Sequence, residues 1–209
     1  MRARIAIVDY GMGNRRSVEK ALEHVGARPV MTRDPALLRR MDGLLLPGVG
    51  AFPAAMRTLR ELELEDVLVE RVRAGVPLFG SCMGMQLLFD STEENEGATG
   101  LGLLRGRVRR LSAPRSKLPH IGWSEVSWQR DSPLLEGVPR PSVFYHVHSF
   151  VPEPADSEDI LGVSEYDTEF VSVVARDNVY GAQFHPEKSS RTGLAMLAAF
   201  GRICSRVAA

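Results

Sequence analysis

One of the two cysteines in this 209-residue chain lies in a corner flanked by glycines. The segment GSCMG (residues 80–84) follows an apolar run that ends at Phe79, and an amphipathic segment begins directly after it. A nucleophile held in a strained strand-to-helix turn needs glycine on both sides, whereas a core thiol does not. A helix N-terminus also favours a thiolate. The pattern predicts that Cys82 is a nucleophile, although a buried cysteine in an ordinary turn would fit so short a motif.

A nucleophilic cysteine needs a base, and the segment QFHPEK (residues 183–188) offers one. His185 follows an apolar run, and Glu187 lies two residues beyond it. A carboxylate there can accept an imidazole N–H, fix the tautomer and stabilise the imidazolium, while Pro186 stiffens the link. We therefore expect Cys82, His185 and Glu187 to form a catalytic triad assembled from two strand ends.

Three other histidines have different interpretations. His120 follows a proline in a loop-like stretch, and His146 and His148 alternate on a predicted strand, so that they share one face. The H-x-H pair, completed by Cys82 or His185, would be a metal site. No carboxylate lies near the pair in sequence to orient it, so we predict no metal and no cofactor.

Attack on an amide also requires N–H donors for the oxyanion. The Met83 N–H directly follows the nucleophile, and the glycine-rich turn at residues 47–50 can direct a second N–H toward a substrate. That turn alone would be interpreted as an ordinary loop.

These residues fall at the ends of predicted strands. In the first half of the chain, short apolar runs alternate with helical patterns, which predicts an α/β fold with a mostly parallel twisted sheet and helices on both faces. Sites in such sheets form at the carboxyl ends of the strands. The second half, rich in β-branched and aromatic residues, predicts extra antiparallel strands. Strands are expected at 4–8, 28–32, 44–46, 77–79, 143–150, 171–175 and 179–184, and helices around 18–25, from 35, over 51–62 and 64–74, and around 194–204.

The composition is typical of one globular domain, with 44% hydrophobic and 25% charged residues. The 26 basic and 26 acidic side chains balance, so charge gives no case for a nucleic-acid or membrane partner. The sequence carries no signal-peptide or membrane-spanning pattern and no disulfide framework. We expect a soluble cytoplasmic protein, with Cys204 in the core on the apolar face of the closing helix.

Together these motifs resemble class I (triad-type) glutamine amidotransferases, and most closely the branch that serves imidazole glycerol phosphate synthase. The cysteine corner and FHPE are common to the class, whereas the other motifs are more specific to that branch. The resemblance covers essentially the whole chain, so residues 1–209 are expected to form one such domain. The motifs are DYGMGN (9–14), LPGVGAF (46–52), CMGMQLLF (82–89), PHIGW (119–123), HSF (148–150) and GAQFHPEKS (181–189).

The resemblance implies a glutaminase of histidine biosynthesis. It would hydrolyse L-glutamine through a cysteinyl thioester and pass the ammonia to a cyclase subunit, with which it would form a heterodimer. Cys82 would attack the side-chain amide, His185 would act as base and then acid, and Glu187 would orient the ring. The oxyanion hole corresponds to Val49, Gly50 and Met83, the glutamine site to Gly48, Gln86, Glu94, Ser149 and Phe150, and the partner interface to Asn14, Trp123 and Lys188.

Several residues depart from the family's usual pattern without removing a catalytic group. Phe150 stands where tyrosine is common, so any contact of that hydroxyl is lost, and Arg15 adds a charge near the partner-facing loop. The other departures are Ser81, Met83 and Ser124.

Two alternatives remain open. The first is a glutaminase subunit of another synthase, such as anthranilate or pyridoxal phosphate synthase, which DYGMGN and PHIGW disfavour. The second is a thiol redox or metal-binding module on the same fold, which leaves Gln86, Glu94 and Lys188 without a role.

Overall fold

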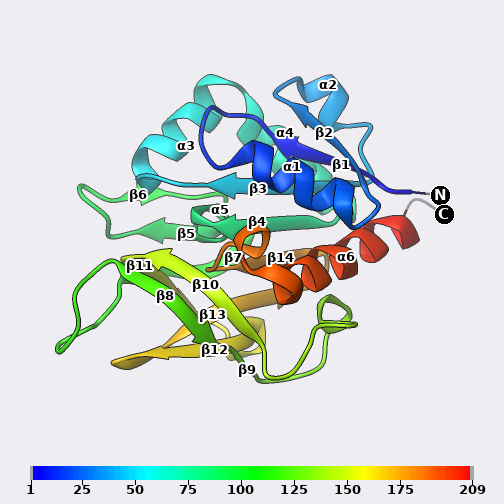
Figure 1. The fold of residues 1–209 in the computed structure, drawn as a ribbon. Coiled ribbons are helices and arrows are strands. Elements are labelled where there is room, and N and C mark those ends of the chain that lie inside the picture. The colour runs from blue at the N-terminus through cyan, green and yellow to red at the C-terminus, as the bar shows by residue number, and fades with distance from the viewer. Residues whose placement is uncertain (1, 208–209) are drawn as a thin grey trace.

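The structure is a computed structural model that describes residues 2–207, and an eight-stranded sheet lies at its centre (Figure 1). Its first five strands are parallel, and the three that follow are antiparallel to their neighbours. This confirms the predicted α/β fold, with antiparallel strands contributed by the second half. In spatial order the strands are β2 (Arg28–Thr32), β1 (Arg4–Val8), β3 (Gly43–Gly48), β4 (Leu78–Cys82), β14 (Val179–Ala182), β13 (Thr168–Arg176), β12 (Ile160–Tyr166) and β9 (Ser127–Trp128).

The two central strands β3 and β4 are buried along their whole length. Continuous burial is typical of parallel strands covered on both faces. Both strands extend beyond their predicted ends, because β3 pairs with β4 as far as Gly48, opposite Cys82. Backbone pairing in a ladder does not require β-favouring side chains, so the apolar runs alone marked only part of each strand.

Helices cover both faces of this sheet (Figure 1). α1 (Arg15–His24) and α6 (Ser190–Val207) pack on one face, where Leu22 and Phe200 share a core cluster with Ile5. α2, α3 and α4 cover the other face in a second cluster, and the Asp34 carboxylate caps α2 by accepting the Ala36 N–H at 2.8 Å. Their bounds are α2 (Pro35–Leu38), α3 (Phe52–Glu61) and α4 (Leu64–Arg73).

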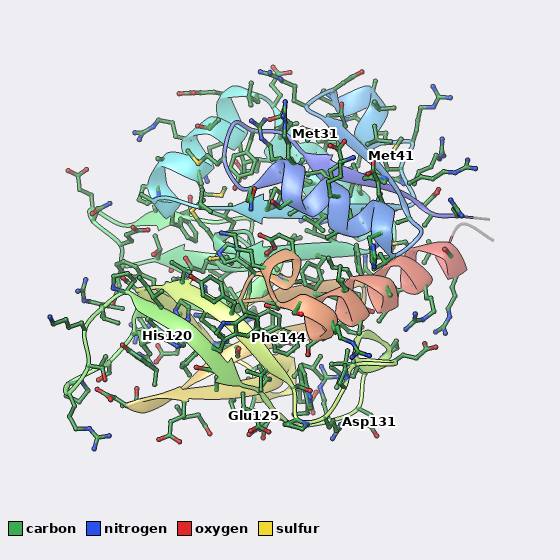
Figure 2. All side chains as sticks on the ribbon, viewed as in Figure 1. Met31, Met41, His120, Glu125, Asp131 and Phe144 are labelled. Carbon is green, nitrogen blue, oxygen red and sulfur yellow. The ribbon has the colours of Figure 1, made fainter. Side chains whose placement is uncertain are left out.

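Two smaller sheets flank the central one. The sheet of β11, β7, β5 and β6 packs on the cluster beneath α3 through Leu104 and Val108, whereas β8 and β10 form a separate antiparallel pair. Figure 2 shows Phe144 of β10 in the interior, with Glu125 and Asp131 at the edge of the molecule. The remaining elements are α5 (Met83–Gln86), β5 (Phe89–Thr92), β6 (Ala98–Thr99), β7 (Leu104–Arg110), β8 (His120–Glu125), β10 (Val143–His148), β11 (Phe150–Pro154) and the 3-10 turns η1 (Pro133–Leu135), η2 (Ser157–Asp159) and η3 (Pro186–Lys188).

Two predicted segments differ in detail. The strand expected over 143–150 breaks at Ser149, because β10 pairs with β8 and β11 pairs with β7 in another sheet. His120, expected in a loop, is the first residue of β8 and is buried. Among residues 2–207, no helix is both long and apolar enough to cross a membrane.

Candidate active site

The cysteine corner has the strained geometry that its glycines predicted. Cys82 ends β4 with φ +55° and ψ −114°, directly before α5, a region that non-glycine residues rarely occupy. A Cβ atom at Gly84 would lie 1.9 Å from the Leu46 carbonyl oxygen, and one at Gly80 would lie 2.5 Å from the Gly84 oxygen. Both glycines are therefore required by close backbone packing around the turn. The strained backbone holds Cys82 at the carboxyl end of β4, where the residue is 6% exposed.

His185 follows β14 and lies at the same carboxyl-terminal end of the sheet as Cys82. β14 runs parallel to β4, with Ala182 paired to Ser81, so both chains leave the sheet at their carboxyl ends side by side. The His185 Nδ1 atom lies 3.0 Å from the Glu187 Oε1 atom, and the Glu187 side chain is 2% exposed. The structure thus brings the three predicted triad residues together, with Glu187 behind the imidazole.

The His185 ring is held in its charged form. Burial alone would lower its pKa, but hydrogen bonds to Cys82 and Glu187, and the charges of both groups, outweigh burial and raise the pKa of His185 to about 10. At neutral pH the ring is an imidazolium between a sulfur nucleophile and a carboxylate. It can therefore donate a proton to a leaving group without first taking one from water.

A pocket of about 340 Å³ opens over these residues. Ten of the fourteen sequence-predicted site residues line it, and the other four, Gly48, Glu187, Asn14 and Trp123, do not. Pro119, Val147 and His148 also line it, and the sequence assigned none of the three to the glutamine site. The lining residues are Val49, Gly50, Cys82, Met83, Gln86, Glu94, Pro119, Val147, His148, Ser149, Phe150, His185 and Lys188.

The end of β3 and the turn after it contain one uncrowded and one tightly packed glycine. Gly50 adopts φ +101°, a conformation that glycine reaches without strain, and no atom lies within 4 Å of its would-be Cβ. Gly48 is packed against the corner, since a Cβ there would lie 2.6 Å from the Gly84 nitrogen. Tyr10 holds the start of the turn by donating its hydroxyl to the Pro47 carbonyl at 2.6 Å.

A buried amide behind the nucleophile was not predicted from sequence. The Gln183 Oε1 atom accepts a hydrogen bond from Gln86 Nε2 at 3.1 Å, and Gln183 Nε2 lies 3.8 Å from Cys82 Sγ. Gln86 Nε2 also donates to the Phe150 carbonyl at 2.9 Å. Because the Gln183 oxygen faces Gln86, its NH₂ group faces the sulfur. Its place directly after β14, two residues before His185, is the signal that could have identified it.

The remaining predicted residues divide between the pocket and the surface. One Glu94 oxygen accepts the Phe52 N–H at the start of α3 at 2.8 Å, which fixes that carboxylate in the pocket wall. Trp123 is 54% exposed on β8, with the tilted ring of Tyr145 beside it. Asn14 directly precedes α1, and Lys188, expected at a partner interface, also lines the pocket.

Comparison with known proteins identifies the family. A family model described as glutamine amidotransferase class-I matches residues 6–203. The chain is 50% identical over 196 residues to the imidazole glycerol phosphate synthase subunit HisH of Bacillus cereus (strain G9842), covering 94% of this chain and 93% of that protein. It is 49% identical over 198 residues to the subunit of the same name from Geobacillus thermodenitrificans (strain NG80-2), covering 92% of each.

Two solved structures share the fold. PurLQS from Thermotoga maritima aligns with a TM-score of 0.77 at 19% identity, covering 97% of this chain and 99% of that one. The crystal structure of a glutamine amidotransferase aligns with a TM-score of 0.71 at 22% identity, covering 98% of each chain. The family model and the curated relatives extend over nearly all of the sequence, and the chain belongs to the class-I glutamine amidotransferase family.

Proposed function

We propose that this chain is the glutaminase subunit of imidazole glycerol phosphate synthase, with Cys82, His185 and Glu187 as its catalytic triad. The observation that carries the proposal is the pocket that places a strained cysteine beside a buried histidine–carboxylate pair. The curated relatives, about 50% identical along almost their whole length, support the assignment to histidine biosynthesis rather than to another synthase.

The first half-reaction forms a thioester. His185 first acts as base and holds the proton of the Cys82 S–H group. The sulfur then bonds to the side-chain carbonyl carbon of glutamine, and the carbonyl π pair moves onto oxygen. The His185 imidazolium then gives its proton to the amide nitrogen, and collapse of the intermediate breaks the C–N bond and releases ammonia. The raised pKa of His185 keeps this proton on the ring until the amide nitrogen takes it.

The second half-reaction reverses these roles. Neutral His185 takes a proton from water, the hydroxide oxygen attacks the thioester carbon, and the C–S bond breaks to give glutamate and the restored thiolate. Backbone N–H groups of Met83 and of Val49 or Gly50 stabilise the oxyanion in both steps. Freedom to rotate at Gly50 lets that peptide present either its N–H or its neighbour's carbonyl to the pocket.

Glutamine binding uses the charged ends of the same pocket. The Glu94 carboxylate attracts the α-ammonium group of glutamine, and Gln86 with residues 149–150 forms the opposing wall. Gly48 contributes by allowing β3 to approach the corner closely. No cofactor enters either half-reaction.

A partner surface lies beside the pocket. Ile121 and Trp123 are 60% and 54% exposed and alternate along β8, so they share one face, and Val49 is 43% exposed at the pocket rim. Large apolar side chains gathered on one exposed face favour an interaction site. We assign this surface, with Asn14 and Lys188, to a cyclase subunit that receives ammonia in a heterodimer.

The test separates the two nitrogen sources. With the cyclase subunit present, Cys82→Ser should abolish glutamine-dependent synthesis and leave synthesis from added ammonium intact. Cys204→Ala is the matched control, because Cys204 is buried in the α6 core, and both activities should persist. Equal loss of both activities in Cys82→Ser would contradict the nucleophile assignment. Stimulation of glutamine hydrolysis by an anthranilate synthase subunit instead of the cyclase would contradict the assigned pathway.

A further inference from the structure

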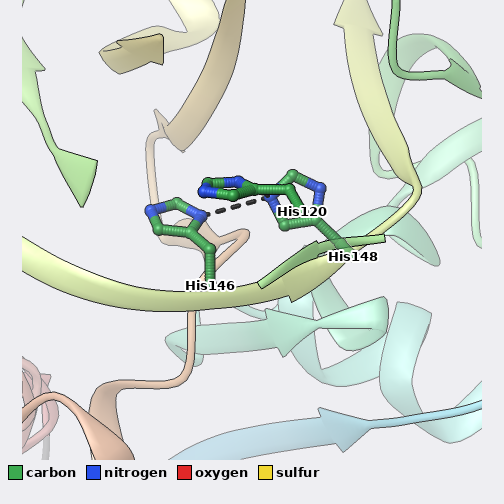
Figure 3. Close-up of side chains that lie close together, drawn as sticks. All are labelled: His120, His146 and His148. Atoms are coloured by element: carbon green, nitrogen blue, oxygen red, sulfur yellow. Dashed lines mark hydrogen bonds between the residues drawn. The ribbon is translucent and has the colours of Figure 1, made fainter. Parts of the chain in front are cut away.

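Three buried imidazoles converge between β8 and β10 (Figure 3). His120 begins β8, and His146 and His148 lie two residues apart on β10, with His148 paired to His120 in the ladder. Their exposed fractions are 2%, 0% and 6%. The catalytic scheme above uses none of these rings, although His148 forms part of the pocket wall.

The nitrogen positions match the edges of a metal coordination shell. His148 Nε2 lies 3.3 Å from His120 Nδ1 and 3.2 Å from His146 Nδ1, and one nitrogen of each ring lies within 4.8 Å of the other two. A tetrahedral Zn²⁺ ion with Zn–N bonds of about 2.0–2.1 Å holds its nitrogens about 3.3–3.4 Å apart. Two of the three nitrogen–nitrogen distances therefore already match those around a tetrahedral Zn²⁺ ion.

Hydrogen bonds among the three rings cannot give every facing nitrogen atom a partner. A neutral imidazole nitrogen carries either one N–H or one lone pair, so His148 Nε2 forms one well-directed hydrogen bond and not two. One of the two facing Nδ1 atoms is then left without a full partner in a buried site, which is costly. A cation among the three nitrogens would accept one lone pair from each.

Two contacts hold the His120 ring in place for ligation. Ser124 Oγ lies 3.1 Å from His120 Nε2, so the outward nitrogen of that ring has the oxygen partner that metal-bound histidines usually have. Tyr166 stacks on His120 at 4.2 Å and holds its plane.

We propose that His120, His146 and His148 form a binding site for a divalent transition-metal ion of the zinc class. The site shares no residue with the triad, although His148 also lines the pocket assigned to glutamine. From the sequence we considered a metal site made of His146, His148 and either Cys82 or His185, and we predicted that no metal binds. The proposed site differs in both the third ligand and the expected binding. The ladder between β8 and β10 supplies His120 as the third ligand instead, from a segment that the sequence predicts as a loop.

Cobalt(II) is the direct probe, because its absorption reports tetrahedral nitrogen coordination. The titration uses the full chain carrying Cys82→Ser, so that the catalytic thiol cannot bind the ion. We expect one equivalent of Co²⁺ to bind with visible absorption bands and to be displaced by Zn²⁺. His146→Phe in the same background should weaken binding more than about 100-fold, since even loss of an outer-shell partner costs about 10–100-fold. His24→Gln, which removes an exposed histidine on α1, should leave affinity unchanged.

A second measurement does not depend on the folding of His146→Phe. X-ray absorption of the Zn²⁺-loaded Cys82→Ser chain should show three imidazole scatterers and no sulfur. Binding only when Cys82 is present, equal affinity in His146→Phe, or fewer than three imidazoles around the ion would overturn the proposal.

Discussion

Replacing Glu187 by glutamine removes the negative charge beside the His185 ring while keeping an acceptor for its Nδ1–H. The two groups lie 3.0 Å apart, and both side chains are almost fully buried, so solvent screens the pair little. The substitution is nearly isosteric, and the fold should persist. The change therefore isolates the electrostatic contribution of the carboxylate.

The size of the effect follows from the hydrogen bond. A bond to a charged partner contributes about 1.5–3 kcal/mol and a neutral one about 0.5–1.5 kcal/mol, so the loss is about 1–2 kcal/mol. At about 1.36 kcal/mol per unit, this lowers the pKa of His185 by about one unit. The native pKa is raised to about 10, so His185 in the variant still carries its proton at pH 7 but loses it at lower alkaline pH.

The assay is the pH dependence of glutamine hydrolysis by the complex with the cyclase subunit. The alkaline limb of the rate profile should move about one unit toward lower pH, because the leaving ammonia requires a protonated His185. An NMR titration of the His185 ring, assigned by its absence in His185→Ala, measures the same shift directly. His185→Ala should cause a larger rate loss than Glu187→Gln. An unmoved alkaline limb together with an unshifted titration would refute the role of Glu187.

The same pair links stability to pH. The folded pKa of His185 is raised above its ordinary value of 6.5, so the stabilisation is complete below pH 6.5 and is lost as pH rises through about 10. Denaturant unfolding should therefore show native stability declining over this window, and Glu187→Gln should flatten the decline. Identical pH profiles for the two proteins would contradict the linkage. Two further substitutions test the corner and the amide behind it. Gly84→Ala should destabilise the protein by about 1–3 kcal/mol in denaturant unfolding, because its Cβ would lie 1.9 Å from the Leu46 oxygen, whereas Gly201→Ala in open space on α6 should not destabilise it. Equal midpoints for the two would contradict the packing argument. Gln183→Leu should slow iodoacetamide alkylation of Cys82 about fivefold, as expected from the loss of one hydrogen bond of about 1 kcal/mol. An unchanged alkylation rate would exclude Gln183 as a positioning residue.

The local sequence was sufficient to predict the Cys82 turn and the contact between His185 and Glu187. Glycines on both sides of Cys82 specify a tight turn because only hydrogen fits near the facing backbone, and that requirement is visible in the residue types. His185 and Glu187 are two residues apart, with a proline between them, so their contact at 3.0 Å follows from a short, stiff connection. The alternation of apolar runs and helical patterns likewise specified the class of fold.

Contacts between distant segments required the tertiary structure. Cys82 lies beside His185 because β4 and β14 are neighbours in the sheet. The sequence of neither strand predicts which strand it pairs with. Gln183 reaches the sulfur through the same pairing. Strand order depends on how all the helices and strands bury their apolar faces together, which no local pattern contains.

The histidines show this division most clearly. The spacing of His146 and His148 placed both on one face of a strand, because side chains alternate with a period of two. Neither the composition nor the spacing predicted His120 beside them, since its segment contains proline and glycine and resembles a loop. Only the antiparallel register of β8 against β10, which sets His120 opposite His148, brought the third ring into the cluster.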